Sequence, residues 1–445
     1  MRIRPALRIN GALELPGDKA ISHRAAILAA LARGTSRIEN FSTSDDCAAT
    51  LFCLKRLGVN AELQEGRLRV EGVGPRGLSA PRSELDCRNS GSTMRMLAGV
   101  LAGQSFESRL TGDESLGQRP MKRIIEPLEL MGARVQSREA HAPLRIKGRR
   151  PLKAISYEMA VASAQVKSCI LLAGLYADGP TRVIEAPAAT RDHTERMLRR
   201  YGATVTTVMR GDEGGPPCEI QLEPPLELIA REFRIPGDIS SAAFFIAAAS
   251  LLPGSRLLIK GVSMNPTRTG FLSVLLSLGA AVQAKAGYEN SAEPEDEAFG
   301  DVMVHGGVGL APNAQKDSYR VDGSLIPQLI DELPMLAVVG TMLPGGLSIR
   351  DAGELRLKET DRIRATVENL RAMGAEVLEH DDGLTITGRT ALRGARLRSY
   401  GDHRIAMAFT IAALLAEGES ELEGAECASV SFPEFYSLLE SVIER

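Results

Sequence analysis

Apolar positions along the chain form one pattern that recurs six times. In each copy a nearly continuous apolar, Ala-rich stretch is followed by a glycine and then by a short segment of alternating apolar and polar residues. A stretch that is apolar on all faces predicts a buried helix, and alternation predicts a strand that packs on one face. We expect each glycine to cap its helix in the left-handed conformation. The copies occupy residues 21–41, 91–112, 163–186, 239–261, 331–352 and 402–425.

The glycines of this first series are spaced almost evenly, which indicates internal repeats. Their separations are 69, 76, 75, 92 and 72 residues. The long fourth interval contains the polar tract Lys285 to Ser318, which we interpret as an insertion that forms a surface loop or an extended hairpin. The glycines are Gly34, Gly103, Gly179, Gly254, Gly346 and Gly418.

A second motif with the same period lies between the copies of the first. It predicts an amphipathic helix that ends in a glycine and leads into a strand, at residues 54–63, 128–137, 198–207, 275–284 and 370–379. A sixth helix, residues 432–445, ends the chain without its strand. We expect the opening segment, Leu7 to Leu15, to supply that strand, so that both ends of the chain complete the last unit.

The two motifs together predict an α/β (α+β) protein of six units with two helices each, arranged as two lobes of three units. Because the chain ends share a unit, we expect one discontinuous lobe of residues 1–20 and 238–445 and an inserted lobe of residues 21–237. The two connections fall at Pro16-Gly17-Asp18 and Pro236-Gly237-Asp238, whose turn chemistry suits a hinge of two strands. A generic α/β protein with coincidental Ala-rich helices is disfavoured, because two separate motifs keep one period.

Charged residues gather where these helices are predicted to begin. Lys19 and Arg24, Asp331, and Asp402 with Arg404 lie at helix starts of the first series. Ser, Asp and Asn at such positions are ordinary caps. Arginine in a first turn opposes the helix dipole, however, and repeated arginines there favour an external anion. We therefore expect a locally basic, anion-binding cleft. The basic residues at or near the helix starts of the second series are Arg119, Arg191, Arg268, Lys358 and Arg362.

Composition and motifs exclude several other classes of function. The 445 residues include 53 Lys and Arg against 56 Asp and Glu, a net charge of −3 that gives no general attraction to nucleic acid or to an anionic membrane. The longest apolar run, residues 242–252, is too short to span a bilayer, and the N-terminus lacks the apolar core of a signal peptide. Neither phosphate-binding glycine loops nor metal-ligand spacings occur. The six cysteines contain no C-x-x-C pair, so we expect reduced thiols in the cytoplasm.

Eight motifs in order along nearly the whole chain closely resemble the 5-enolpyruvylshikimate-3-phosphate (EPSP) synthase family of enolpyruvyl transferases. They read LPGDKAISHRA, NSGSTMR, DESLGQRPM, SAQVKS, TRDHTERML, IDELPMLA, LRLKETDRI and GDHRIAMA. The resemblance implies two lobes of three βαβαββ units each, joined by a double crossover, as an inside-out barrel. It also implies transfer of the enolpyruvyl group of phosphoenolpyruvate to the 5-hydroxyl of 3-phosphoshikimate, with release of phosphate, on the shikimate pathway to chorismate and the aromatic amino acids.

The same resemblance assigns roles to individual residues. Asp331 would accept the proton of the 5-hydroxyl, and Glu359 with Lys19 would exchange the C3 proton of phosphoenolpyruvate. The implied ligands of 3-phosphoshikimate are Lys19, Ala20, Arg24, Ser163, Ala164, Gln165, Arg191, Asp331 and Lys358. The implied ligands of phosphoenolpyruvate are Lys19, Gly91, Arg119, Gln165, Arg362 and Arg404. The family needs no cofactor and no metal, and the resemblance implies a cytoplasmic monomer that is a target of the inhibitor glyphosate.

Two positions, and the version of one motif, depart from the usual family pattern. Ala20 replaces a serine, which removes a hydroxyl contact to the phosphate of 3-phosphoshikimate, and Val430 lies where many members have a lysine. The SAQVKS motif and Val430 resemble a branch with glyphosate-tolerant members, whereas Gly91 lacks the methyl group that confers tolerance. From the direct steric effect at Gly91 we expect sensitivity.

Two rival functions stay open from the sequence. The sister transferase of cell-wall synthesis, which acts on UDP-N-acetylglucosamine, typically has a K-N-x start and a loop cysteine before its R-P, and this chain has neither. A non-catalytic anion-binding protein of the same fold is disfavoured by the joint presence of Lys19, Asp331 and Glu359.

Overall fold

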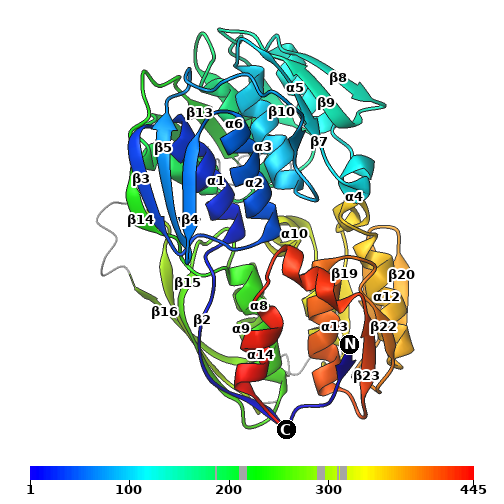
Figure 1. Ribbon diagram of the computed structural model, residues 1–445. Helices are drawn as coiled ribbons and strands as arrows, with labels where there is room; N and C mark the ends of the chain where they lie inside the picture. The colour runs from blue at the N-terminus through cyan, green and yellow to red at the C-terminus, as the bar shows by residue number, and fades with distance from the viewer. Residues whose placement is uncertain (186–187, 210–217, 288–295, 308–309, 311–317) are drawn as a thin grey trace. The chain divides into compact units, whose positions relative to one another are not determined.

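The computed structural model describes residues 1–185, 188–209, 218–287, 296–307, 310 and 318–445. The chain divides into two compact units, whose elements are labelled in Figure 1. The terminal unit contains both chain ends and consists of Met1–Pro16, Pro236–Asn290 and Ala298–Arg445. The inserted unit consists of Gly17–Ile235 together with a short stretch that includes Asp296 and Glu297.

Three four-stranded sheets of the inserted unit share one pairing pattern. In each sheet the first edge strand runs parallel to its neighbour, and the next two pairings are antiparallel. A repeated sequence pattern thus gives a repeated pairing. The sheets are, in spatial order, β14 (Glu232–Arg234), β3 (Arg33–Glu39), β5 (Arg67–Val73) and β4 (Asn60–Gln64); β6 (Leu85–Asp86), β7 (Glu107–Thr111), β9 (His141–Lys147) and β8 (Arg134–Arg138); and β10 (Ser156–Met159), β11 (Thr181–Glu185), β13 (Cys218–Leu222) and β12 (Val205–Met209).

The Ala-rich helices of the inserted unit are buried on nearly all sides, as their apolar pattern predicted. In helix α1 every residue from Ile21 to Leu31 is buried. Helices α3 and α6 pack so closely that Gly99 of α3 lies against the backbone of Cys169 in α6. The helices of this unit are α1 (Lys19–Leu31), α2 (Asp45–Arg56), α3 (Gly91–Ala102), α4 (Glu114–Gln118), α5 (Lys122–Leu130), α6 (Ala164–Gly174) and α7 (His193–Arg200).

The terminal unit contains a five-, a four- and a three-stranded sheet within the part of the chain that the structure describes. The four-stranded sheet repeats the pairing pattern of the inserted unit. The sheets are β16 (Ala281–Gly287), β17 (Phe299–His305), β15 (Arg256–Ser263), β2 (Arg8–Glu14) and β24 (Ile443–Glu444); β18 (Tyr319–Val321), β19 (Leu347–Ile349), β21 (Gly383–Ile386) and β20 (Val377–His380); and β1 (Arg2–Ile3), β23 (Ser420–Glu423) and β22 (Arg396–Arg398).

The helices of the terminal unit also bury their apolar residues. Helices α8, α11 and α13 contact one another, and Phe245 of α8 packs edge-on against Phe432 and Phe435 near the chain end. The helices are α8 (Ile239–Leu251), α9 (Gly270–Ser277), α10 (Ile326–Leu329), α11 (Leu333–Gly340), α12 (Arg362–Ala372), α13 (His403–Leu415) and α14 (Phe435–Val442), with 3-10 turns η1 (Gly323–Leu325), η2 (Gly353–Leu357) and η3 (Ala425–Val430).

The expected place of the opening segment was wrong in part. Strand β2 does pair with β24 at the chain end, but its longer ladder runs parallel to β15, from Asn10 opposite Arg256 to Glu14 opposite Lys260. The strands β22 and β23 are instead joined by β1, only two residues long. The longer ladder supplies more hydrogen bonds, so β2 belongs to the sheet of β15.

The interpretation of the polar tract as an insertion was wrong for its described strand, which has the same place in its sheet as β5 has between β3 and β4. Strand β17 lies inside the tract and pairs antiparallel with both β15 and β16. Its Val302 and Val304 are fully buried, so β17 is a core strand of its sheet. Residues 288–295, 308–309 and 311–317 of the tract lie outside the described residues.

The left-handed glycine caps belong to the second series of motifs and not to the first. Gly58, Gly132, Gly202, Gly279 and Gly374 each follow the last helical turn directly, with φ between +86° and +96°. In the first series, helix α1 ends at Leu31 and Gly34 lies inside β3. These buried helices end in an extended or helical residue, so the expected capping glycine lies further along the chain or, at Gly103, has a φ of −88°.

The division into units differs slightly from the expected boundaries. The chain changes unit between Pro16 and Gly17 and between Ile235 and Pro236, so residues 17–20 belong to the inserted unit. The physical reason is helix α1, because Asp18 caps it by accepting a hydrogen bond from the Ile21 N–H (3.0 Å) and Lys19 begins it. Splitting the chain at residue 20 would cut this first turn from its helix.

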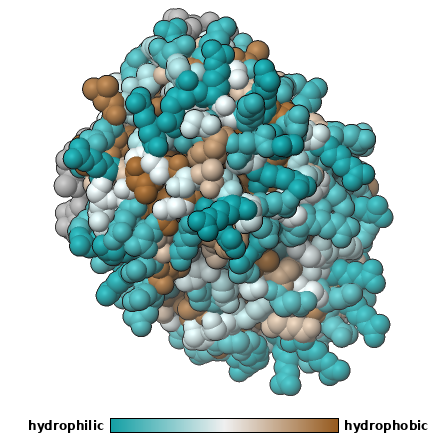
Figure 2. Space-filling view, turned by 45° about the horizontal axis from the view of Figure 1, so that its top comes forward, coloured by the Kyte–Doolittle hydropathy of each residue, from teal (hydrophilic) through white to brown (hydrophobic). Residues whose placement is uncertain are grey.

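Hydrophilic residues cover most of the face drawn in Figure 2, with apolar residues in small groups between them. Folded proteins normally leave apolar surface of this kind. Within the described ranges, every helix is too short or too polar to cross a lipid bilayer. The six cysteines are free thiols.

The close packing of α3 on α6 gives a direct test of the fold. In Gly99→Ala the new methyl carbon would lie 2.2 Å from the carbonyl oxygen of Cys169, so backbone must move. Overpacking of this kind costs about 1–3 kcal/mol. We expect a lower urea midpoint in unfolding followed by circular dichroism. The matched control is Gly117→Ala in α4, whose methyl group meets no atom within 4 Å, and it should leave the midpoint unchanged or raise it. A normal midpoint for Gly99→Ala would contradict the packing.

Candidate functional site

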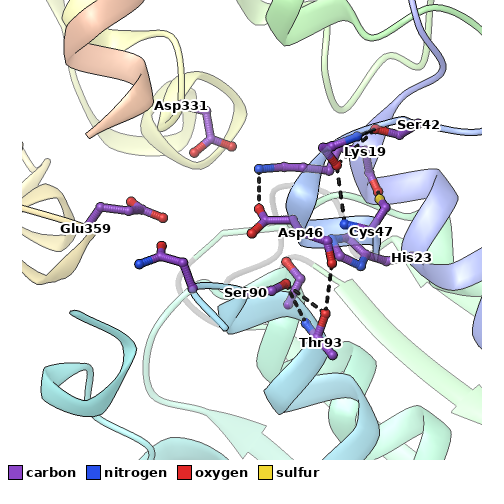
Figure 3. A network of polar contacts seen from close by, with 12 residues as sticks. Lys19, His23, Ser42, Asp46, Cys47, Ser90, Thr93, Asp331 and Glu359 are labelled. Atoms are coloured by element: carbon purple, nitrogen blue, oxygen red, sulfur yellow. Dashed lines mark hydrogen bonds and ion pairs between the residues drawn. The ribbon is translucent and has the colours of Figure 1, made fainter. Parts of the chain in front are cut away.

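Lys19 begins helix α1 of the inserted unit, where the helix dipole attracts an anion. Its ammonium forms an ion pair with Asp46 near the start of α2, with Nζ 2.7 Å from Oδ2. Both side chains keep some exposed surface, 17% and 12% of their area. Asp46 thus holds Lys19 in place at the edge of solvent, where a ligand can reach it (Figure 3).

A chain of buried polar side chains links helices α1, α2 and α3 in this unit, and Figure 3 labels three of its members, His23, Ser90 and Thr93. His23 Nδ1 lies 2.7 Å from Thr50 Oγ1, which lies 2.7 Å from Thr93 Oγ1. Thr93 in turn hydrogen-bonds Ser90, the residue that caps α3 directly before Gly91. Burial, with Lys19 and Arg24 adding to it, holds the pKa of His23 well below its ordinary value, so the ring is neutral. The network therefore fixes the α1, α2 and α3 starts relative to one another without adding charge.

Arg24 lies one turn after Lys19 and is held by three donated hydrogen bonds. Its Nε donates to Thr194 Oγ1 (2.7 Å), and its terminal nitrogens donate to Ser168 Oγ (2.7 Å) and to the Ala20 carbonyl (2.8 Å). A guanidinium has five N–H donors, so these bonds leave two for a further acceptor. Burial, with a smaller contribution from the charge of Arg191, lowers the pKa of Arg24 to about 10 against the opposing effect of nearby carboxylates. Like charges that lie close together disfavour each other's charged form, and a bound anion reduces that effect.

Gln165, Gly91 and Arg119 lie together around Arg95. Arg95 donates to the side-chain oxygen of Gln165 (2.6 Å), and Gln165 donates to Ser92 Oγ (2.9 Å). A methyl group on Gly91 would lie 2.7 Å from a terminal nitrogen of Arg95 and 3.3 Å from one of Arg119. The start of α3 therefore carries two guanidinium groups beside a residue with no side chain.

Arg119 itself is 7% exposed and is oriented by the loop before it. Its NH2 donates to Asn89 Oδ1 at 2.6 Å and to Ser115 Oγ at 3.3 Å. Asn89 is in turn held by Asp113, to which its amide donates at 2.7 Å. The neutral side chains of Asn89 and Ser115 thus set the direction of the guanidinium.

In the terminal unit Arg362 gathers three carboxylates. Its Nε donates to Asp402 (2.8 Å), NH2 donates to Glu359 (2.6 Å) and NH1 donates to Asp331 (3.5 Å). Burial alone would lower the pKa of Arg362, but Asp402, Glu359 and Asp331 together raise it, so the group stays charged. The Asp402 side chain has no exposed area, whereas those of Asp331 and Glu359 (both drawn in Figure 3) keep 19% and 17%. Two of the three acids can therefore reach a ligand.

The remaining predicted residues sit at helix starts or in loops. Arg404 lies in the first turn of α13 and is 6% exposed, and its NH1 meets no hydrogen-bond partner within the described part of the chain. Ser163 caps α6 through the N–H of Val166 (3.5 Å), and Ala164 begins that helix. Lys358 follows η2 directly before Glu359, and Arg191 precedes α7; both are half-buried.

Within each unit the structure thus brings most of the predicted residues together. Arg24 and Arg191 interact in the inserted unit, as do Gly91, Arg119 and Gln165 through Arg95. Asp331, Glu359 and Arg362 meet in the terminal unit. Residues 3–439 match the family profile of EPSP synthase, described as 3-phosphoshikimate 1-carboxyvinyltransferase.

The chain belongs to the EPSP synthase family. A protein of Koribacter versatilis named 3-phosphoshikimate 1-carboxyvinyltransferase is 48% identical over 446 residues, which cover 100% of this chain and 99% of that protein. A protein of the same name from Solibacter usitatus is 47% identical over 444 residues, with 100% and 99% coverage. The solved structure of an EPSP synthase from Acinetobacter baumannii is 38% identical, covers 99% of this chain and 98% of its own, and superposes with a TM-score of 0.83. The mixed α/β fold of small sheets and helices is therefore the fold of the EPSP synthase family.

Sequence reasoning missed several residues that hold the candidate site together. Asp46, which binds Lys19, lies in an ordinary acidic helix start, and Arg95, which binds Gln165, is one turn into an apolar motif. A cation inside an otherwise apolar helix was the available signal for Arg95 and also for Lys167 of α6, which is fully buried. In the described part of the chain, no group of three or more His, Cys, Asp or Glu side chains is placed to hold a metal ion.

The buried neutral His23 predicts a pH dependence of stability. The folded-state pKa lies below the unfolded value of about 6.5, so the unfolded chain binds the extra proton as pH falls. The contribution of His23 to the free energy of unfolding is therefore fully present above pH about 6.5. Below that pH it decreases by at most about 1.4 kcal/mol per pH unit.

Urea unfolding of wild type and His23→Asn at pH 7.5 and 5.5 checks this expectation. The variant should lose less stability between the two pH values than wild type does. His141→Asn, which changes a histidine of strand β9, should keep the wild-type loss. Equal losses for wild type and His23→Asn would contradict a buried neutral ring.

Proposed function

We propose that the protein performs the reaction of its family: it transfers the enolpyruvyl group of phosphoenolpyruvate to the 5-hydroxyl of 3-phosphoshikimate and releases phosphate, in the shikimate pathway. The observation that carries this proposal is the match of residues 3–439 to the EPSP synthase family. Relatives that carry the name of this enzyme align over the whole chain at 43–48% identity. The protein is thus a transferase that acts on two small anions.

The cations of the inserted unit support a role in holding the phosphorylated substrate. We assign 3-phosphoshikimate to Lys19, Arg24 and Arg191, because the mutual repulsion of the two arginines is relieved by an anion. Guanidinium groups recognise phosphate in a planar, two-bond geometry that an ammonium cannot provide. The further ligands that we assign to 3-phosphoshikimate are Ala20, Ser163, Ala164, Gln165, Asp331 and Lys358.

Phosphoenolpyruvate is assigned to Arg119 and to the start of α3, where Gly91 leaves room beside two guanidinium groups. Arg404 supports this assignment because its buried NH1 lacks a partner within the described ranges, and a buried charged donor without an acceptor is costly. Arg362 contributes charge while it orients the acids. The assigned ligands are Lys19, Gly91, Arg119, Gln165, Arg362 and Arg404.

The chemistry requires proton transfers at two places. Protonation of C3 of phosphoenolpyruvate makes C2 electrophilic, and the 5-hydroxyl attacks C2 to give a tetrahedral phospho-intermediate. Loss of phosphate and of a C3 proton then forms the enol ether. We assign the hydroxyl proton to Asp331 and the C3 proton to Glu359, since these are the two exposed acids on Arg362, with Lys19 as the third catalytic residue. The arginines stabilise charge on the departing phosphate.

We further propose that the protein works in the cytoplasm as a monomer, without nucleic-acid or membrane partners, and that glyphosate inhibits it. The free thiols support a reducing compartment. The assigned groups already supply the acids, bases and cations of the reaction, so the proposed mechanism uses no cofactor.

An assay of phosphate release tests the proposed function directly. The purified protein is mixed with both substrates, with each substrate alone, and with phosphoenolpyruvate plus UDP-N-acetylglucosamine. Release with the first pair only, together with an enol-ether product of the expected mass, supports the proposal. Release with the UDP sugar would favour the sister transferase of cell-wall synthesis, and binding without release would favour an anion-binding protein.

Asp331→Asn separates binding from proton transfer. The amide keeps the shape of the side chain but cannot accept the hydroxyl proton. A positioned general base contributes typically 10²–10⁴-fold, so kcat should fall by about that factor while 3-phosphoshikimate still binds in calorimetry. Asp322→Asn, which removes a carboxylate paired with Arg320 in the same unit, is the control and should retain kcat. Near-normal turnover of Asp331→Asn would overturn the assignment.

Gly91→Ala tests the assigned phosphoenolpyruvate site through glyphosate. The methyl group would press on Arg95 (2.7 Å) and Arg119 (3.3 Å), whose side chains can shift only slightly in a packed site. We expect the inhibition constant of glyphosate to rise far more than the KM for phosphoenolpyruvate, because the inhibitor is longer than the substrate.

The wild-type enzyme and the control Gly117→Ala should both be sensitive to glyphosate in the same steady-state assay. Wild-type resistance to millimolar-scale glyphosate would contradict the steric argument and point to Ala20, Ser92 or Met96 as residues that reshape the site.

A further inference from the structure

A fully buried ion cluster lies beneath the proposed 3-phosphoshikimate residues of the inserted unit. Lys167 of α6 has its Nζ 2.7 Å from Glu195 of α7 and 3.1 Å from Glu185 at the end of β11. All three side chains are at most 2% exposed. Burial alone would lower the pKa of Lys167, but the two carboxylates outweigh it and raise that pKa, so the ammonium is charged.

The cluster forms hydrogen bonds with the backbone N–H, the hydroxyl and the carbonyl of Thr190. The Thr190 N–H donates to Glu185 Oε1 at 3.0 Å, and the Thr190 hydroxyl donates to the same oxygen. The Thr190 carbonyl accepts from Lys167 Nζ at 3.4 Å. The ammonium thereby uses its three donors on Glu185, Glu195 and Thr190. The polar groups of a typical loop residue form hydrogen bonds with water. Those of Thr190 instead form hydrogen bonds with the charged side chains of Glu185 and Lys167.

Arg191 follows Thr190 directly, and the cluster also borders Arg24. Ser168, next to Lys167, and Thr194, next to Glu195, are the two hydroxyl residues that accept from the Arg24 guanidinium. Because Thr190 cannot turn, the backbone of Arg191 has a fixed position and direction. The cluster is thus adjacent in sequence to the residues that hold Arg24 and to Arg191, the two arginines that we assign to the substrate phosphate.

We propose that the Lys167–Glu185–Glu195 cluster is a positioning device that aims Arg191 at the phosphate of 3-phosphoshikimate, with Thr190 as its point of contact; this inference rests on the proposed function. Lys167 does not touch substrate, since it is fully buried and its donors are used. It acts through Thr190, and its charge is needed to hold the two carboxylates in the interior.

The test uses Thr190, because removal of Lys167 would strand two buried carboxylates and unfold the protein. Thr190→Val keeps the volume and deletes only the hydroxyl that donates to Glu185. We expect the KM for the phosphorylated substrate to rise about tenfold, one bidentate contact being worth at least that factor. The KM for phosphoenolpyruvate and the melting temperature should change little. Thr190→Ser, which restores the hydroxyl, should restore the wild-type KM.

The matched control is Thr181→Val at the other end of β11. Thr181 is fully buried, but its hydroxyl has no partner within the described residues, so its loss should leave both KM values unchanged. A double-mutant cycle with Arg191→Met completes the test: if Thr190 acts through Arg191, Thr190→Val should have no further effect on KM once Arg191 is gone.

The outcomes distinguish a failure of this inference from a failure of the proposed function on which it rests. A selective rise in the KM for the phosphorylated substrate that vanishes in the Arg191→Met background supports positioning. An unchanged KM in an active Thr190→Val enzyme, or equal rises for both substrates, overturns the positioning role alone. Absence of turnover by wild type overturns both the proposed function and this inference.

Discussion

Buried positive charge at the beginnings of helices is the constraint on which the rest of this structure depends. A guanidinium or ammonium removed from water needs acceptors, whereas the free backbone groups at the beginning of a helix are mostly donors. Arg24, Lys167 and Arg362 are all in this situation. Arg24 donates hydrogen bonds to two hydroxyl groups and to the Ala20 carbonyl. Lys167 forms ion pairs with two carboxylates, and Arg362 forms ion pairs with three.

The balance of charge around these cations differs between the two units. We accordingly propose that one unit mainly binds anions and that the other transfers protons. In the inserted unit the hydrogen bonds donated by Arg24, Arg95 and Arg119 go to neutral hydroxyl, amide and carbonyl oxygens, and we propose that these guanidinium groups also bind a phosphate or carboxylate. Around Arg362 acids are in excess, which suits groups that accept and return protons. In the proposed function the same local architecture, a helix start inside a repeated unit, thus has anion binding as its role in one place and acid–base chemistry in another.

Much of this organisation could be predicted from the sequence because it is encoded locally. The period of the glycines, the apolar helices and the aspartate caps at Asp18 and Asp402 need only neighbouring residues. What the sequence did not reveal are contacts between distant residues: Lys19 with Asp46 lies 27 positions apart, Arg362 with Asp402 lies 40, and Arg95 with Gln165 lies 70. The strand order at the chain ends was missed for the same reason, because the longer ladder of β2 is formed with β15, which is distant in the sequence, and only its first residues pair with β24.

The central claim is that cations at helix starts of the inserted unit bind a phosphate group. Isothermal titration of the protein with 3-phosphoshikimate and, separately, with shikimate tests it most directly, because the two ligands differ only in that group. We expect shikimate to bind at least 100-fold more weakly, and added salt to weaken 3-phosphoshikimate binding more than shikimate binding. Equal affinities for the two ligands would contradict it.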